Sequence, residues 1–580
     1  MTRWGRRIAG DTTTNGQIRH EDALKADGTA RIAVAVTVFA GVCALAAWSG
    51  RADNAETHAA WYSIAPPLLA IVLAFLTRHV MLSLGVAILV GGFLSAVPQA
   101  PASGHAWTQG VVATASYLTT TLSSGTNLLI LSFIPPIFTL VEIVVASGGF
   151  AGIVVWLLRR VRSRQSAQLA TATMGLLCFI DDYANAIIVG SMMQPITDRF
   201  RTSRAKLAFL VDATSAPVSG LAVVSTWIAY EVGLFADVSV HLGMGKTGYA
   251  MFFDALSYRF YCLLMLVFVF AHVLTGRDFG PMRTAERRMP AEGGVGTADT
   301  EQAVQPLVAG RALNALLPLG GLVAFHITGL WIDGAGPARL ADGGSPLSWD
   351  YWREVISASE HSHFILMCAA LFGMVLAALC GRLSGSLAPS ALPGCVVRGV
   401  RRALLPSIVL VLAWSLKHCC QHLGTGDFLT GLLAGRIPPH WFAPLLFLVA
   451  SLTSFATGTS WGTMAILIPT AIPIAFALDG NAYGLTTTIS LGAILDGAIF
   501  GDHCSPISDT TIISSVASSC DLVEHVRTQL PYSLAVAAIA LVVAYIPCSL
   551  GLASTWGLTL GAATVLLVLL IVGRRIHCAE

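Results

Sequence analysis

The chain has 580 residues, of which 55% are hydrophobic and only 11% are charged. A soluble domain carries about 25% charged residues, so this composition excludes a soluble protein and predicts a polytopic helical membrane protein. The formal net charge of +2 gives no indication of a nucleic-acid partner. The 12 cysteines are scattered through apolar segments, which is typical of buried free thiols and not of a disulfide framework.

Residues 1–30 are polar and mixed in charge, so we expect a cytosolic polar tail and no cleavable signal peptide. A first transmembrane half follows at residues 31–275. Most of its apolar segments approach or exceed the roughly 20 residues that a spanning helix requires. They lie at residues 32–49, 62–77, 80–97, 126–147, 150–158, 167–198, 205–234 and 257–275.

A polar linker at residues 276–310 separates this half from a second transmembrane half at residues 311–580. The linker is basic and Gly-rich, which predicts a flexible cytosolic loop. Apolar segments of the second half lie at residues 311–331, 361–380, 402–423, 440–456, 460–478, 484–500, 505–518, 530–550 and 553–573. Because some of these will be half-helices or re-entrant hairpins, we expect about 12–14 membrane segments in total.

Basic clusters are expected to mark the cytosolic face, since short cytosolic loops are enriched in Lys and Arg. Such clusters lie in the N-terminal tail, at residues 159–164, in the linker, at residues 398–402 and at Arg574-Arg575. We therefore expect a multi-pass protein of the inner cell membrane, surrounded by lipid, with both termini in the cytoplasm. The sequence leaves open whether the protein forms a homo-oligomer.

Each half contains a polar break that carries an aromatic residue. Residues 179–185 read Phe-Ile-Asp-Asp-Tyr-Ala-Asn, and residues 457–463 read Thr-Gly-Thr-Ser-Trp-Gly-Thr. Aligning Tyr183 with Trp461 places a proline of one half opposite a proline of the other, 12 residues further on in each. A carboxylate at membrane depth is costly, so acids at such a break indicate an ion or solute pathway.

A second pair of breaks follows in each half, formed by an acidic residue, hydroxyl residues and a proline. Residues 212–217 read Asp-Ala-Thr-Ser-Ala-Pro, and residues 502–506 read Asp-His-Cys-Ser-Pro. Paired breaks in two halves point to a transporter site, because interrupted helices present backbone groups and partial charges to an ion. The predicted fold class is all-α, with two repeats and broken helices, and we expect the repeats to be inverted.

Three stretches resemble the motifs of the NhaC family of sodium/proton antiporters, within the ion-transporter superfamily. They are residues 181–185, residues 457–463 and residues 501–511, the last reading Gly-Asp-His-Cys-Ser-Pro-Ile-Ser-Asp-Thr-Thr. With residues 65–78, which resemble the family's early helices, the resemblance covers roughly residues 60–550. It implies gradient-driven exchange of sodium ions for protons, with no cofactor besides these transported species. Some relatives exchange organic acids or amino acids, so the resemblance leaves the cargo open.

Oxygen-bearing side chains at the breaks are the candidate ion ligands, because hard cations prefer oxygen. Asp182 and Asp502 lead the set, and Pro506 lies between Asp502 and Asp509, so we expect only Asp502 of these two to contact the ion. A buried carboxylate can exchange a cation for a proton, although each aspartate could instead cap a helix or pair with a basic residue. The full set is Asp181, Asp182, Asn185, Asp212, Thr457, Thr459, Ser460, Asp502, Ser505, Ser508, Asp509 and Thr510.

Three further acids lie singly in apolar segments. Glu142 and Glu231 are candidates for a proton relay or a gate, and equally for polar groups that pack between helices. Asp496 precedes the central motif at residues 501–511, and we expect it to support that motif rather than to bind the ion.

His418 and His422 lie four residues apart beside Cys419, a spacing that lets two imidazoles share a soft metal. They are weak metal candidates, and a helix-end cluster without metal is the favoured interpretation. No nucleotide-binding loop or nucleophile–base constellation is present, so we predict a transporter and not an enzyme. The alternatives to sodium/proton antiport are a sodium- or proton-coupled exchanger of an organic acid or amino acid and, third, a metal-dependent membrane enzyme or sensor.

Overall fold

The structure is a computed structural model that describes residues 61–77, 79–96, 105–158, 161–288, 311–425 and 438–575, together with Thr37, Gly41 and Phe428. The expected tail at residues 1–30 and nearly all of the expected span at residues 32–49 lie outside this part of the chain. Within it, the regular structure is helical except for two strands of two residues each. The prediction of an all-α fold is confirmed.

The elements of the first half and the linker are η1 (Trp61–Ile64), α2 (Ala65–Thr77), α3 (Val80–Ala96), α4 (His105–Ser123), α5 (Gly125–Ala146), α6 (Gly149–Leu158), α7 (Arg164–Leu177), α8 (Asp182–Arg199), α9 (Arg204–Asp212), α10 (Ala216–Ser219), α11 (Thr226–Leu242), α12 (Gly248–Leu256), α13 (Phe260–Thr275), β1 (Arg277–Asp278) and α14 (Gly280–Arg288). Those of the second half are α15 (Leu313–Asp333), α16 (Gly336–Ala341), α17 (Trp349–Ala358), α18 (Ser362–Leu383), η3 (Pro389–Ala391), α19 (Leu392–His422), α21 (Pro439–Thr457), α22 (Ser460–Leu478), α23 (Leu485–Cys504), α24 (Asp509–Ala517), α25 (Leu522–Ile539), the π-helical η4 (Ala540–Tyr545), α26 (Ile546–Ser549), α27 (Ser554–Ile571) and β2 (Arg574–Arg575).

Eight helices in the described ranges are long and apolar enough to cross a membrane, and the number is nine if α12 and α13, which are bent by 48°, form one span. The sequence predicted about 12–14 membrane segments. The number of unbroken spans is smaller because polar residues divide several apolar segments. The segment at residues 167–198 is divided into α7 and α8, and the segment at residues 205–234 is divided into α9, α10 and the start of α11.

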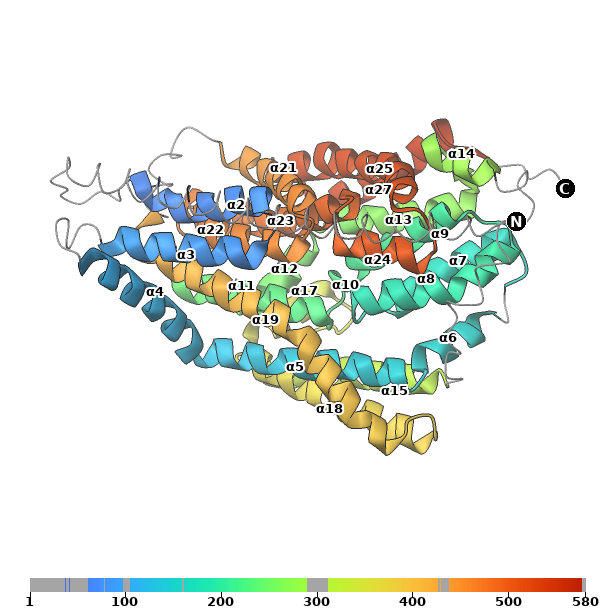
Figure 1. Cartoon of the computed structure of the whole chain (residues 1–580), viewed down its shortest axis with the longest axis horizontal. Coiled ribbons are helices and arrows are strands. Elements are labelled where there is room, and N and C mark those ends of the chain that lie inside the picture. Colours follow the sequence, from blue (N-terminus) through green and yellow to red (C-terminus); the bar gives the residue numbers. More distant parts are fainter. Residues whose placement is uncertain are drawn as a thin grey trace, which may run out of the picture.

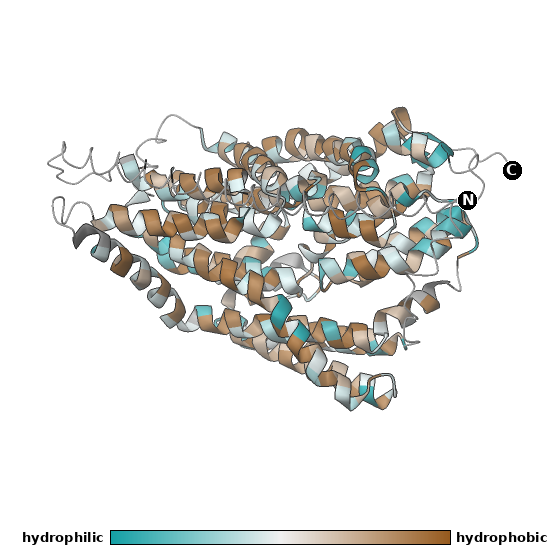
Figure 2. Ribbon diagram, in the orientation of Figure 1, coloured by the Kyte–Doolittle hydropathy of each residue, from teal (hydrophilic) through white to brown (hydrophobic). Residues whose placement is uncertain are grey.

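The helices form two groups that α19 joins (Figure 1). In the smaller group, α18 packs against both α5 and α15 along one side of the molecule. In the larger group, α21 packs along α23, and α8 packs against α9 and α24. The long helix α19 contacts α3 and α22 of the larger group and α5 of the smaller one. Apolar residues cover the helices of both groups (Figure 2), as expected for a protein in contact with lipid.

Three of the predicted basic clusters meet at one end of the molecule. Strand β1 pairs antiparallel with β2, so that Arg277 lies opposite Arg575. The carboxylate of Glu286 in α14 forms an ion pair with Arg164 at the start of α7. Residues 277–288 are therefore a strand and a helix, and not the flexible loop that the sequence predicted; residues 289–310 lie outside the described part.

The basic segment at residues 398–402 is also not a loop, because it lies within α19. Its two outer arginines form ion pairs with Glu142 of α5, at 2.8 Å from Arg398 Nε and 2.9 Å from Arg402 Nη1. Arginines four residues apart share one face of a helix, which allows both to reach the same carboxylate. Glu142 therefore joins α5 to α19.

Candidate functional site

Two helices, one from each half, begin at matching polar breaks. Asp181 is the N-cap of α8, and its carboxylate accepts a hydrogen bond from the backbone N–H of Ala184 at 2.8 Å. Thr459 is the N-cap of α22, and its hydroxyl accepts from the backbone N–H of Gly462 at 3.3 Å. The aligned aromatic residues at 183 and 461 therefore occupy the same position in their helices. For Asp181, the structure favours the helix-cap alternative that the sequence left open.

The central motif at residues 501–511 contains the break between α23 and α24. Two glycines let α23 approach its neighbour α21 closely: a Cβ at Gly497 would lie 2.5 Å from the Phe447 carbonyl oxygen, and one at Gly501 would overlap the Ser451 carbonyl. The Ser505 hydroxyl donates to a backbone carbonyl of α21 at 2.7 Å. These contacts place the end of α23 beside the start of α22.

A cavity of about 880 Å³ lies where these breaks meet. It is lined by residues from both halves, including the starts of α8 and α11, the break between α21 and α22, and the break between α23 and α24. Of the 12 predicted site residues, eight line it: Asp181, Asp182, Thr457, Thr459, Ser460, Asp502, Asp509 and Thr510. The structure thus brings together acids and hydroxyls that lie more than 300 residues apart in the sequence.

Asp182 and Asp502 are buried carboxylates, with exposed fractions of 1% and 4%. Within the described ranges, neither oxygen of Asp182 has a hydrogen-bond partner, nor does Oδ1 of Asp502. Asp502 Oδ2 accepts from the hydroxyls of Ser460 at 3.0 Å and Thr510 at 3.4 Å. Burying a carboxylate without a partner is costly, so this arrangement is suited to binding a desolvated cation or protons.

The other two acids of the cavity have different surroundings. Asp181 is buried, but its second oxygen accepts from the Thr226 hydroxyl at 3.2 Å in addition to the cap bond. Asp509 is exposed, and it accepts a long hydrogen bond of 3.4 Å from the Tyr183 hydroxyl. Asp502 and Asp509, which lie on either side of Pro506, therefore both line the cavity, but only Asp502 is buried.

Four of the predicted site residues do not line the cavity and instead form hydrogen bonds at or between the helix breaks. Asn185 donates from Nδ2 to the carbonyls of Gly175 at 2.8 Å and Thr214 at 2.9 Å. Ser505 bonds to α21, as described above, and the Ser508 hydroxyl lies 2.9 Å from that of Thr510. Their hydroxyl and amide groups thus hold the breaks in place.

Asp212, the fourth, lies in a separate buried cluster. Its Oδ2 accepts from Gln529 Nε2 at 2.6 Å and lies 3.3 Å from His525 Nε2, and its Oδ1 accepts from the Ser514 hydroxyl at 3.2 Å. The similarity between residues 212–217 and 502–506 predicted corresponding breaks in the two halves, with both acids as candidate ion ligands and Asp502 ahead of Asp212. The structure distinguishes them, because the first is surrounded by hydrogen-bonding side chains and the second faces the cavity.

Sequence reasoning missed two prominent residues of the cavity wall, Trp227 and Arg402. Trp227 lies in the first turn of α11, and the Ser225 cap was a local signal of that helix start. Arg402 was assigned to a cytosolic loop. Two signals could have indicated its position. Arg402 follows Arg398 by four residues, which is typical of one helix face, and the lone acid Glu142 could be the carboxylate that this face contacts.

The weak metal candidates His418, Cys419 and His422 gain no support from the structure. Nδ1 of His422 lies 2.7 Å from the Tyr117 hydroxyl, and the neighbouring Lys417 forms an ion pair with Asp237 at 2.5 Å. In the described part of the chain, no group of three or more His, Cys, Asp or Glu side chains is arranged to hold a metal ion.

The sequence profile of the Na+/H+ antiporter family matches residues 218–548. An uncharacterised protein of Haemophilus influenzae is 29% identical over 518 residues, which cover 89% of this chain and 96% of that protein. The Na(+)/H(+) antiporter NhaC of Alkalihalophilus pseudofirmus is 31% identical over 162 residues, which cover 28% of this chain and 32% of the relative.

Among solved structures, the fold is similar to that of the YdaH transporter of Alcanivorax borkumensis, which was described as having an unusual topology. The TM-score is 0.52 and the sequence identity 16%, with 84% of this chain and 99% of that chain covered. This likeness concerns the fold, whereas the match to the family profile extends over more than half of the sequence and includes the central motif. The chain therefore belongs to the Na+/H+ antiporter family, and it is a multi-pass membrane protein that works as a secondary antiporter.

Proposed function

We propose that this antiporter exchanges sodium ions for protons and that Asp182 and Asp502 hold the cation. The observation that carries this proposal is the set of three buried carboxylate oxygens without hydrogen-bond partners among the described residues, all on acids that line one cavity. Elsewhere in that part of the chain, most buried acids have a basic partner, as Asp278 has in Lys206. Two acids left unpaired in one place favour a site whose partner is the cargo.

Neutral oxygens complete the proposed ligand shell. The hydroxyls of Ser460 and Thr510 already contact Asp502, and Thr457 ends α21 at the cavity wall. The C-terminal end of a helix carries partial negative charge, which favours a cation there. Protons and sodium compete for the same carboxylates, because protonation removes the charge that attracts the cation. This competition is sufficient for antiport if the site opens to one side of the membrane at a time.

The arrangement of the helices supports proposals about topology. We place the cavity near the bilayer midplane, between two inverted repeats, and we infer that alternating access comes from one group of helices moving against the other. We place the basic end formed by β1, β2 and the starts of α7 and α14 in the cytoplasm of a cell with an inner membrane. The segment after β2 is then cytoplasmic, and we propose the same side for the N-terminal tail because it contains a basic cluster.

A second candidate function is favoured by the size and lining of the cavity. A water molecule occupies about 30 Å³ of liquid, so about 880 Å³ is far more than one sodium ion and a few waters require. The wall also includes the Arg402 side chain and the aromatic rings of Trp227 and Trp461. A guanidinium group binds carboxylates well, so an organic acid or amino acid could enter beside the sodium ion.

Everted membrane vesicles with a fluorescent reporter of the proton gradient test both proposals. For sodium/proton exchange, adding sodium should dissipate the gradient in wild-type vesicles but not in D182N or D502N vesicles. D198N is a matched control, because Asp198 lies on the same helix as Asp182 but is paired with Arg204 at the helix end. If sodium alone has no effect and one solute from a panel of organic acids and amino acids does, the second candidate replaces the first.

A further inference from the structure

One arginine and two carboxylates form a fully buried cluster away from the cavity. Arg259 Nε lies 3.0 Å from Asp496 Oδ1, and its Nη1 lies 3.4 Å from Glu231 Oε1. All three residues have exposed fractions of 0%. They come from α11, from the bend between α12 and α13, and from α23, so the cluster joins the two halves of the chain.

The two carboxylates of this cluster differ in how well they are held. Asp496 Oδ2 accepts from the Tyr261 backbone N–H at 2.5 Å and from the Tyr545 hydroxyl at 2.8 Å, in addition to the arginine contact. Glu231 has only the long contact to Arg259, and its Oε2 has no hydrogen-bond partner among the residues that the structure describes. Asp496 is therefore suited to remaining ionised, whereas Glu231 is not.

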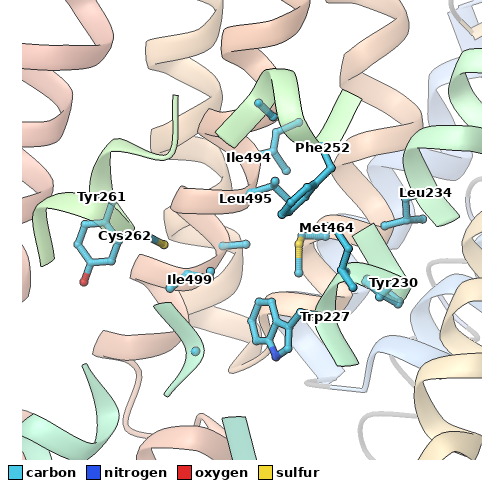
Figure 3. Close-up of a cluster of buried hydrophobic side chains, with 14 of the residues drawn as sticks. Trp227, Tyr230, Leu234, Phe252, Tyr261, Cys262, Met464, Ile494, Leu495 and Ile499 are labelled. Atoms are coloured by element: carbon cyan, nitrogen blue, oxygen red, sulfur yellow. The ribbon is translucent and has the colours of Figure 1, made fainter. Parts of the chain in front are cut away.

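The surroundings make the charge balance important. Figure 3 shows apolar side chains of α11, α12, α22 and α23 converging in this region, and two of the labelled residues, Tyr230 and Leu495, directly precede the acids of the cluster in the sequence. The other titratable side chains at the cluster are the thiol of Cys262, 3.7 Å from Arg259 Nη2, and the phenol of Tyr545. With both acids ionised the cluster has a net charge of −1, and one proton makes it neutral. An uncompensated buried charge is costly, so the cluster favours holding one proton.

We propose that Glu231 carries a proton that is exchanged in the transport cycle, at a site separate from the cation ligands. This inference rests on the proposed sodium/proton exchange and adds one proton to those that compete with sodium in the cavity. The proton resides on the oxygen that has no other partner. It leaves to water when movement of the helices opens the cluster to one side of the membrane; Arg259 then compensates the Glu231 carboxylate, while Asp496 keeps its bonds from the Tyr261 N–H and the Tyr545 hydroxyl.

The position of the cluster links that movement to the cavity. Glu231 lies four residues after Trp227, which lines the cavity, so both are on one face of α11. The preceding Tyr230 donates from its hydroxyl to the Trp461 carbonyl at 2.6 Å, which ties α11 to the start of α22. Arg259 lies at the 48° bend between α12 and α13, and Asp496 lies on α23, the helix that also carries Asp502 in its last turn. A change of the angle at this bend shifts Arg259 between the two carboxylates.

The test measures the sodium gradient that balances a fixed pH gradient in proteoliposomes, with the membrane potential clamped to zero by potassium and valinomycin. For n protons exchanged per sodium ion, net sodium flux stops when the sodium ratio equals the proton ratio raised to the power n. E231Q should lower n by one, so the balancing sodium ratio falls about tenfold for a gradient of one pH unit. This ratio does not depend on how much protein folds or how fast it works.

Three further variants make the result decisive. E231D keeps a carboxyl group and should retain the wild-type balancing ratio. D496N leaves Arg259 and Glu231 as a neutral pair without a proton, so it should show the same tenfold change as E231Q. E286Q is the matched control, since Glu286 is equally buried but belongs to an ion pair near β1, and its ratio should equal that of wild type.

A wild-type ratio in E231Q overturns the proposal, at whatever rate that variant works. If E231Q shows no sodium flux, the balancing sodium ratio of D496N decides: a tenfold lower ratio supports the proposal and a wild-type ratio overturns it. Failure of the proposed function is distinguishable, because in that case sodium gradients do not respond to pH gradients even in wild-type proteoliposomes.

Discussion

The cavity and the basic end of the molecule both contain buried acids, but the acids have opposite surroundings. At the basic end, Asp278 forms an ion pair with the buried Lys206 and accepts from the Tyr532 hydroxyl at 2.7 Å. In the cavity, Asp182 has no basic partner, and neither of its carboxylate oxygens accepts a hydrogen bond within the described part of the chain. Burial alone therefore does not separate the acids of these two regions, whereas pairing with a basic residue does.

This difference has an energetic consequence. Replacing a paired buried acid by a neutral residue destabilises the fold, because the charge of its partner is then buried and unpaired. An unpaired buried acid does the opposite, since its own desolvation is not compensated until a cation or proton binds. The two regions should therefore respond in opposite ways to the same chemical change from Asp to Asn.

The largest expected effect is on transport in the cavity variants. D182N and D502N should each abolish sodium-dependent proton movement, a loss of at least about a hundredfold, because a neutral amide cannot compensate a desolvated cation. Their thermal unfolding midpoints in detergent should equal or exceed that of wild type. Sodium-dependent proton flux in proteoliposomes tests the loss of transport, and thermal unfolding of the same protein preparations tests the stability. A variant that loses transport and also unfolds at a lower temperature would show that the acid is structural.

The next effect is on stability at the basic end. D278N should lower the free energy of unfolding by about 3–5 kcal/mol, because it leaves the Lys206 ammonium buried without a counter-charge. E354Q provides the matched control, since Glu354 forms an exposed pair with Arg339 and should cost about 0–1 kcal/mol. Chemical unfolding in detergent measures both. Equal effects of the two substitutions would contradict the contrast between the regions.

Short-range patterns predicted the breaks that form the cavity. Asp181 and Thr459 are helix caps followed by apolar helices, and the alignment of the aromatic residues at 183 and 461 corresponds to equal positions in α8 and α22. Local sequence specifies such features because caps, glycines and prolines act on the backbone within one turn. Eight of the 12 predicted site residues line the cavity for the same reason.

The features that the sequence did not predict depend on contacts between distant segments. Asp212 and Asp502 have similar local sequences, but Gln529 and His525 of α25 surround only the first. Likewise, Arg402 reaches the cavity because Glu142 on another helix accepts its hydrogen bond. Nothing within one helical turn of Asp212 or Asp502 specifies such partners, and the i, i+4 spacing before Arg402 indicates a shared helix face but not which carboxylate it contacts. The role of an acid at a break is therefore decided by helix packing, which a single sequence does not specify.

A smaller effect is expected where a basic residue lines the acidic cavity. Arg402 is held by Glu142 and lies near enough to Asp181 to interact with it electrostatically. E142Q should free this guanidinium to compete with sodium for the carboxylates and so raise the half-saturating sodium concentration about fivefold. The double variant E142Q/R402Q should return it toward the wild-type value. An unchanged sodium dependence in E142Q would exclude competition by Arg402.

The smallest effect concerns the pH dependence of stability at the basic end. Burial raises the pKa of the Asp278 carboxyl, but the Lys206 ammonium, together with the hydrogen bonds that Lys206 and Tyr532 donate, holds the pKa below the ordinary value of 3.8. Because the folded-state pKa is lower than the unfolded one, the carboxylate adds stability above that ordinary value, and this contribution is lost as the pH falls through the folded-state pKa. The difference in unfolding free energy between wild type and D278N should therefore be constant near neutral pH and narrow in acid. A difference that stays constant down to pH values at which both proteins unfold would show that the ion pair is not its source.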